Sequence, residues 1–149
     1  MRVLVASEPD AASVNQRSAL LALTPWAEAG TFEGAPAYRH GEWALLTIRE
    51  LHLERDHLDR DIESAMGERP ELIVYLSKHR SESRTPSLTV HPIGNPKGAE
   101  FGGRPGTFVP ASPLWMTAAL RRLRVEAQEL PYDITFEATH HGPYLETPT

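Results

Sequence analysis

Two adjacent histidines, His140 and His141, close a run of β-forming residues and are followed at once by Gly142 and Pro143. Imidazole can ligate a metal, carry a proton or simply face water, so the pair alone leaves all three interpretations open. Consecutive residues of a regular strand point to opposite faces, and both rings reach one site only if the chain turns there. The Gly-Pro step permits such a turn. One ring could then ligate a metal while the other positions a substrate or moves a proton.

Two other segments end in ionisable residues in the same way. The stretch "ELIVYLSKH" predicts the most strongly buried strand and ends in Lys78 and His79, and "SLTVH" predicts a strand that ends in His91. Ligands of open α/β sheets bind beyond the carboxyl ends of the strands. If these strands are parallel neighbours, four imidazoles and a lysine meet at one edge. Ordinary hydrogen bonds within loops are the alternative interpretation.

The absence of cysteine limits what a metal site could contain. A metal in this chain must be held by His, Asp, Glu or water, because there is no thiolate. A histidine-rich site with a carboxylate such as Glu137 or Glu146 and an open water position suits zinc, which lowers the pKa of bound water and can deliver hydroxide to a carbonyl. No compact ligand motif such as HExxH is present. The spacing therefore permits a zinc site without requiring one.

Charge is distributed unevenly along the chain. The net charge is −5, yet residues 77–106 carry five cations and two acids, a local charge of +3. The five cations are Lys78, Arg80, Arg84, Lys97 and Arg104. Binding to nucleic acid draws on neutralisation of phosphates by such side chains. An acidic protein with one basic segment could therefore receive an anion there, although a solvated basic loop has the same composition.

The elements that position these residues follow from hydrophobic periodicity. We predict a strand in "MRVLVAS", a helix that Pro25 ends, two strands within residues 31–51, and a helix over residues 56–66. The strand before Lys78 follows, then a long Pro- and Gly-rich loop region over residues 81–113 that contains the strand before His91. An amphipathic helix in "PLWMTAALRRLRVEAQEL" and a last strand complete the chain. This order predicts a single α/β domain over residues 1–149 with a mixed, largely parallel sheet.

Composition excludes several classes of protein. A chain of 149 residues with 40% hydrophobic and 23% charged residues is typical of one globular domain with a core. No apolar run is long enough to cross a bilayer, and the first ten residues become polar too early for a signal peptide, so we expect a cytoplasmic protein. His40, His52 and His57 lie in polar stretches and receive no predicted function.

Three stretches, "LSKHRSES", "PSLTVHPIGN" and "EATHHGP", resemble in this order the archaeal and plant type of D-aminoacyl-tRNA deacylase. The resemblance runs over essentially the whole chain. It implies a three-layer αβα sandwich of the phosphorylase/hydrolase type and a zinc-associated hydrolase. Such an enzyme cleaves the ester between a D-amino acid and the 3′ end of tRNA, for which metal- or histidine-activated water is sufficient. The implied partner is the acceptor end of a D-aminoacyl-tRNA.

The resemblance, together with the basic segment, implies a set of site residues. Catalytic roles are expected for Lys78, His79, His140 and His141. Metal ligands are expected among His79, His91, His140 and His141. Substrate contacts are expected from Lys78, Arg80, Ser81, Gly94, Asn95, Gly142 and Pro143.

The family normally continues past the HHGP motif, so we expect this chain to be the amino-terminal part of a longer deacylase or a shortened member. Two other functions stay open. One is another acyl- or peptidyl-tRNA hydrolase. The other is a domain that binds metal or RNA without turnover.

Overall fold

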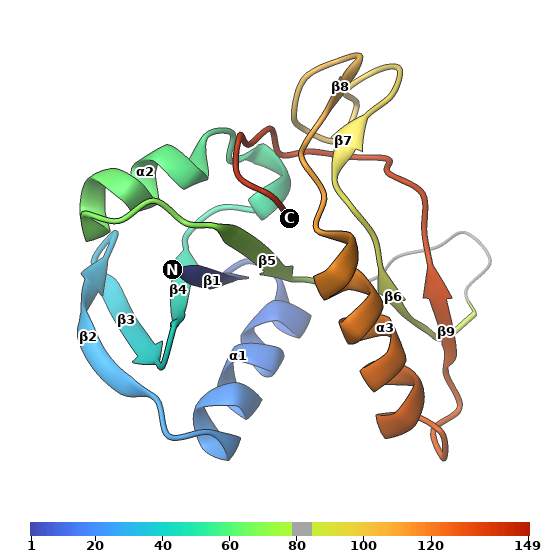
Figure 1. Cartoon of the computed structure of the whole chain (residues 1–149), viewed down its shortest axis with the longest axis horizontal. Coiled ribbons are helices and arrows are strands. Elements are labelled where there is room, and N and C mark those ends of the chain that lie inside the picture. The colour runs from blue at the N-terminus through green and yellow to red at the C-terminus, as the bar shows by residue number, and fades with distance from the viewer. Residues whose placement is uncertain (79–84) are drawn as a thin grey trace.

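A five-stranded mixed sheet forms the centre of the protein, whose computed structural model describes residues 1–78 and 85–149 (Figure 1). Across the sheet the strands are β2 (Ala27–Phe32), β3 (Ala35–His40), β4 (Trp43–Ile48), β1 (Arg2–Ser7) and β5 (Leu72–Leu76). β1 runs parallel to both β4 and β5, whereas β2, β3 and β4 form an antiparallel meander. The predicted α/β class and mixed sheet are confirmed, but parallel and antiparallel pairings are equal in number in this sheet.

The main core lies between this sheet and α2 (Leu58–Met66). Val3 of β1 pairs in register with Ala44 and Ile73, so these three side chains point to the same face. Ile62 of α2 packs into the same buried cluster, together with Leu145 near the end of the chain. The segment that follows His141 is therefore held by the core of the sheet.

Helix α1 (Ala11–Leu23) lies on the other side of the sheet from α2 (Figure 1). Asp10 caps it, since its Oδ1 accepts hydrogen bonds from the backbone N–H groups of Ala12 and Ser13. The helix ends at Leu23, ahead of Pro25, as the sequence predicts. Asp10 thereby fixes the turn between the carboxyl end of β1 and the start of α1.

A second, smaller layer stands beside the main sheet. β6 (Ser87–Val90) and β9 (Asp133–Phe136) pair in parallel, and α3 (Pro113–Glu126) packs against both strands. β5 belongs to the main sheet, so the expectation that β5, β6 and β9 are neighbours in one sheet is wrong for β5. The parallel pairing of β6 and β9 nevertheless brings two of the predicted strand ends together.

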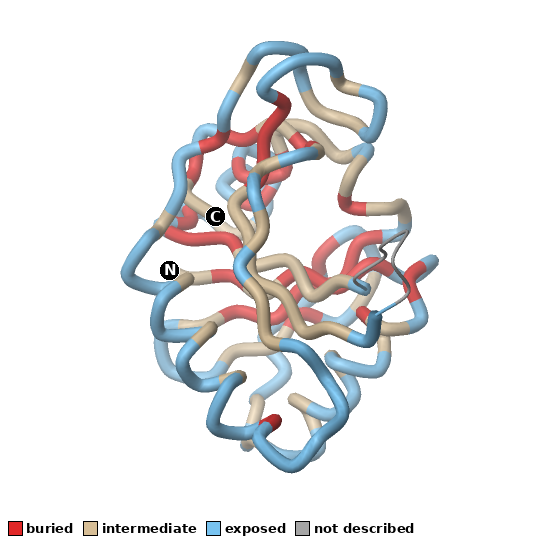
Figure 2. Tube along the Cα trace, turned by 90° about the vertical axis from the view of Figure 1, so that its right-hand side faces the viewer, coloured by how far each residue is buried: buried red, intermediate tan, exposed pale blue. Residues whose placement is uncertain are grey.

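The structure corrects the predicted burial of two elements. Helix α3 has no buried residue (Figure 2). The Leu114 side chain is 85% exposed, although the pattern predicts an apolar face against a core. β5 is an edge strand whose last three residues are only half-buried, whereas β1 and β4 in the middle of the sheet are buried more deeply. Strand β2, which the sequence analysis did not predict, forms the opposite edge.

The remaining elements are short. A 3-10 helix, η1 (His52–Glu54), follows β4, and β7 (Gly94–Asn95) pairs in antiparallel fashion with β8 (Thr107–Phe108). Residues 96–106 connect β7 to β8, and we call this segment the β7–β8 loop. Over residues 1–78 and 85–149, none of the helices combines the length and apolar character that crossing a bilayer requires.

Candidate metal and substrate site

Three of the predicted histidines meet just beyond the carboxyl ends of β6 and β9. His91 follows β6 directly, and His140 and His141 follow β9. The ring centroids lie 4.8 Å apart for His91 and His140, 4.8 Å for His91 and His141, and 4.7 Å for His140 and His141. One nitrogen from each ring lies within 4.8 Å of the other two. We call these three residues the histidine cluster, and its spacing would allow a single metal ion to be held.

The chain brings both members of the adjacent pair to one place because β9 ends early. The strand stops at Phe136, so the alternation of a regular strand no longer applies when the chain reaches His140. The His141 carbonyl then accepts a hydrogen bond from the backbone N–H of Gly94 at 2.7 Å, an isolated antiparallel bridge to β7. The two rings stand at 82° to each other. Both rings therefore reach one place because β9 ends four residues before His140, in addition to the turn that the Gly-Pro step permits.

Each ring of the histidine cluster has its Nδ1 within hydrogen-bond distance of a main-chain carbonyl. The distances are 3.0 Å for His91, 2.6 Å for His140 and 2.6 Å for His141, and the carbonyls belong to Pro92, Ala138 and Gly142. A neutral imidazole that donates from Nδ1 carries its lone pair on Nε2. Histidine ligands in metal sites are commonly oriented by such a bond from the other ring nitrogen. The main chain thus favours the tautomer in which all three Nε2 atoms can act as donors to a metal.

Burial keeps His141 in its neutral form near pH 7. Removal from water lowers the pKa of His141 to about 4, although the hydrogen bond to the Gly142 carbonyl acts in the opposite direction. The neighbouring rings of His91, His140 and His52 lower the pKa further, since a second positive charge close by is unfavourable. Only a neutral imidazole can ligate a metal or accept a proton. His141 is therefore available for either role at neutral pH.

His52, to which the sequence analysis assigns no function, lies beside the histidine cluster. Its side chain is buried, its ring stacks on Tyr75 with 5.2 Å between centroids, and its centroid is 6.3 Å from that of His141. The Ser7 hydroxyl oxygen accepts the backbone N–H of His52 at 3.1 Å and lies 3.4 Å from its Nδ1. Burial lowers the pKa of His52 as well. The signal that was missed is that β4 also ends here, just before His52.

Lys78 lies beyond the carboxyl end of β5, at the same edge of the main sheet as Ser7 and His52. Its backbone N–H donates to Oδ2 of Asp10 at 3.0 Å, and this carboxylate also caps α1. The Lys78 side chain is exposed, and its charge contributes to the lowered pKa of His52. The main chain is therefore anchored while the ammonium group faces solvent. His79, Arg80 and Ser81 lie outside the described residues, so their expected roles stay predictions.

The other predicted substrate contacts hold the β7–β8 loop against the histidine cluster. Asn95 is buried and its Nδ2 donates to the carbonyl of Gly102 at 2.7 Å. The Gly142 N–H donates to the carbonyl of Phe101 at 3.0 Å. A Cβ added at Gly142 would lie 2.4 Å from the backbone of Gly102, so only glycine permits this approach.

Gly94 and Pro143 belong to the same packed region. Both residues are buried. Gly94 has a φ of +140° and lies against the backbone of Phe108, where a Cβ would come within 2.9 Å. These positions shape the wall of the site through main-chain packing.

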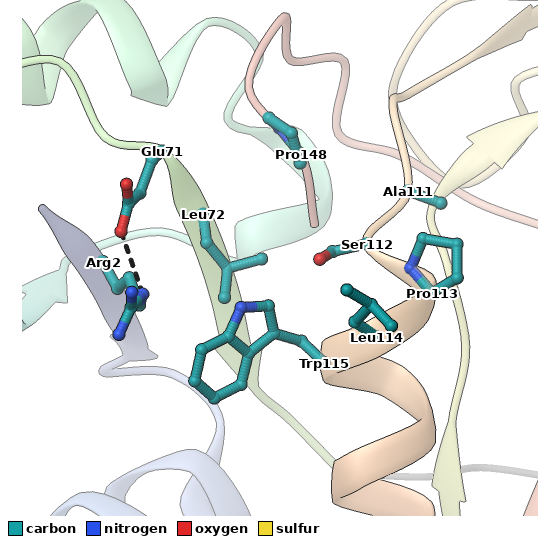
Figure 3. A pocket seen from close by; sticks show the side chains of 9 residues that line it. All are labelled: Arg2, Glu71, Leu72, Ala111, Ser112, Pro113, Leu114, Trp115 and Pro148. Atoms are coloured by element: carbon teal, nitrogen blue, oxygen red, sulfur yellow. Dashed lines mark ion pairs between the residues drawn. The ribbon is translucent and has the colours of Figure 1, made fainter.

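Two hollows stand out in the described part of the chain, and only one adjoins the histidine cluster. It has a volume of about 230 Å³ beside His140. The other, of about 340 Å³, lies near the first residues of β1 and β5, at the opposite end of these strands from Lys78 (Figure 3). There Arg2 is paired with Glu71 beside the indole of Trp115 (Figure 3). The hollow that adjoins the histidine cluster is therefore the smaller of the two.

Comparison with known proteins agrees with the resemblance of the motifs. A family model described as D-aminoacyl-tRNA deacylase matches residues 66–149. The chain belongs to the D-aminoacyl-tRNA deacylase family. The matched range contains Lys78 and the whole histidine cluster, whereas His52 precedes it.

Individual relatives match nearly all of this chain. It is 41% identical to the D-aminoacyl-tRNA deacylase of Methanosarcina mazei over 148 residues, which cover 94% of this chain and 50% of that protein. It is 36% identical to the D-aminoacyl-tRNA deacylase of Pyrococcus horikoshii over 151 residues, which cover 100% of this chain and 55% of that protein. The chain therefore spans about half the length of these relatives.

Proposed function

We propose that this family member hydrolyses the ester bond of D-aminoacyl-tRNA and releases a free D-amino acid and tRNA. The observation that carries the proposal is the histidine cluster, whose three ring nitrogens lie within 4.8 Å of one another beside a hollow. An aminoacyl ester is an activated carbonyl, so a correctly placed water is sufficient and no covalent nucleophile is needed.

We propose zinc as the metal of this site. Three neutral imidazoles with an open fourth position form the donor set of catalytic zinc sites. A zinc ion held by His91, His140 and His141 would supply Lewis-acid chemistry, polarising the ester carbonyl and lowering the pKa of a water. His52 supports the cluster from the side of the main sheet, where Ser7 and Tyr75 fix its position.

Positively charged side chains around the site are proposed to bind the phosphates of the tRNA acceptor end. Lys97 is exposed and lines the hollow beside His140, and the exposed Lys78 lies close enough to His52 for its charge to act on that ring. Arg104 is also exposed, and its guanidinium lies 4.2 Å from the ring centroid of Tyr144 and donates to Nε2 of His57 at 2.7 Å. A guanidinium held in this way can still donate to a phosphate from its other N–H groups. Arg80 is proposed for the same role.

We further propose that residues 1–149 form one domain that corresponds to the amino-terminal part of the longer relatives. The complete fold is proposed to be the three-layer αβα sandwich of the phosphorylase/hydrolase type. The helices on both faces of the main sheet support this arrangement (Figure 1). A tRNA substrate would place the activity in the cytoplasm.

The proposed function is tested on the purified chain by following release of the amino acid from D- and L-aminoacyl-tRNA while bound metal is measured. His91→Ala and His140→Ala should lose zinc and D-specific turnover, and a chelator should abolish turnover in the parent protein. His40→Ala is the matched control, since His40 is exposed and its ring contacts the Pro25 carbonyl at the other end of the sheet. Binding of D-aminoacyl-tRNA without turnover, with zinc present, would refute hydrolysis by this chain.

A further inference from the structure

The hollow beside His140 combines an exposed aromatic ring, a cation and a carboxylate. Its lining residues are Pro96, Lys97, Gly98, Glu100, Phe101, Thr139 and His140, and we call it the Phe101 pocket. The Phe101 side chain is 62% exposed, so its aromatic ring is accessible to a ligand in this hollow. Resting on the proposed function, we infer that the Phe101 pocket binds the terminal adenosine of the tRNA acceptor end.

The size and the aromatic wall of the pocket fit a single nucleobase. Its volume of about 230 Å³ is below the roughly 300–1,000 Å³ of pockets that enclose drug-sized ligands. Proteins hold unpaired bases by stacking them on aromatic side chains, an interaction that needs an exposed ring face. Phe101 offers such a face, and the apolar surface of Pro96 lies in the same wall. One heterocycle can therefore be held without closing the pocket around it.

The polar groups of the pocket match the rest of an adenosine 5′-phosphate. Lys97 can pair with the phosphate that links the terminal nucleoside to the preceding one, since a lysine ammonium acts as a point charge for phosphate. The Glu100 carboxylate can accept a hydrogen bond from an exocyclic amine, which adenine carries and uracil lacks. Both side chains are exposed, so they reach the ligand without a cost of burial.

A main-chain hydrogen bond ties this pocket to the histidine cluster. The Phe101 carbonyl accepts the N–H of Gly142, the residue after His141, at 3.0 Å, whereas the bond from the Gly106 N–H to the Lys97 carbonyl lies within the β7–β8 loop itself. His140 belongs to both the pocket and the cluster. A base stacked on Phe101 would therefore direct its ribose, and the ester on that ribose, towards the imidazoles. The pocket would position the reacting bond rather than only add affinity.

The test compares binding of an intact tRNA with binding of the same tRNA lacking its terminal adenosine, at fixed salt concentration and by fluorescence anisotropy. The parent protein should bind the intact tRNA about tenfold more tightly, the effect expected of one stacked base. Phe101→Ala should remove this preference and Phe101→Trp should keep it. Phe108→Ala is the matched control, because Phe108 is 63% exposed on β8 but does not line the pocket.

Failure of this inference can be told apart from failure of the proposed function. A tenfold preference that survives Phe101→Ala would overturn the pocket assignment, even if D-aminoacyl-tRNA is hydrolysed normally. Loss of the preference in Phe101→Ala, with zinc content and the circular dichroism spectrum unchanged, would support the pocket whether or not the chain turns over substrate. Equal binding of both tRNAs by the parent protein would overturn it directly.

Discussion

Acid should destabilise this protein through His141. In the unfolded chain the pKa of this residue takes the ordinary value of 6.5, whereas burial lowers it to about 4 in the folded protein. A group whose pKa is depressed by folding binds fewer protons in the folded state. The stability that it contributes is present above 6.5 and is lost progressively as the pH falls towards about 4. Burial lowers the pKa of His52 as well, so His52 acts with the same sign.

The size of the effect follows from the separation of the two pKa values. At about pH 5 nearly all unfolded molecules carry the proton on this ring and most folded ones do not, which corresponds to about 2 kcal/mol by linkage. The His141 side chain keeps partial contact with solvent, which reduces the penalty for its charged form. We therefore expect a loss of about 1–2 kcal/mol in the free energy of unfolding from this residue alone.

Urea denaturation of the metal-free protein at about pH 7.5 and pH 5 measures this loss. The parent protein should lose about 1–2 kcal/mol more than His141→Asn, which retains a polar side chain but cannot titrate. His40→Asn should behave as the parent does, because His40 is exposed. Equal losses in the parent protein and in His141→Asn would show that burial does not hold this imidazole neutral, and the reasoning would fail.

Three further substitutions test the packing and charge of the site. Gly142→Ala should cost about 1–3 kcal/mol in the free energy of unfolding, because its Cβ would lie 2.4 Å from the Gly102 backbone; an unchanged melting temperature would contradict this packing. His52→Ala should cost about 2–3 kcal/mol, because it would leave a cavity and remove the contact between His52 Nδ1 and the Ser7 hydroxyl; chemical denaturation would measure this loss against a near-neutral His40→Ala. Lys78→Ala should weaken tRNA binding and reduce its salt dependence with little change in stability, since the side chain is exposed. Lys78→Arg should restore binding only in part. Identical tRNA binding by Lys78→Ala and the parent protein at every salt concentration would refute this role of Lys78.

Local patterns were sufficient for the order of most elements. The apolar run of residues 3–6, the capping Asp10 and the position of Pro25 specify β1 and α1 because they act within a few residues of one another. The turn near Gly41 between β3 and β4 is equally local. The sequence analysis did not predict β2, because Gly30 interrupts the strand and five of its six residues are exposed, so that it lacks an alternating apolar pattern.

Burial and strand neighbours depended on contacts between distant parts of the chain. An apolar run such as that of β5 suits a strand at the centre of a sheet and a strand at its edge equally well. β5 is an edge strand because it pairs only with β1 in the main sheet. Helix α3 has an amphipathic pattern, yet the β6–β9 pair is too narrow to cover its apolar residues. Such pairings are set by tertiary packing, which periodicity does not encode.

The histidines show the same division. His91, His140 and His141 could be found from sequence because each follows a recognisable strand, and ligands gather at strand ends. His52 was not found, although β4 ends four residues before it, because charged residues surround it in the chain and its neighbours in space, Ser7 and Tyr75, lie on β1 and β5. The sequence by itself thus determined which residue types stand at the strand ends. Only the tertiary structure decided which of them are close in space, because the parallel pairings of β1 with β4 and of β6 with β9 join residues that are far apart along the chain.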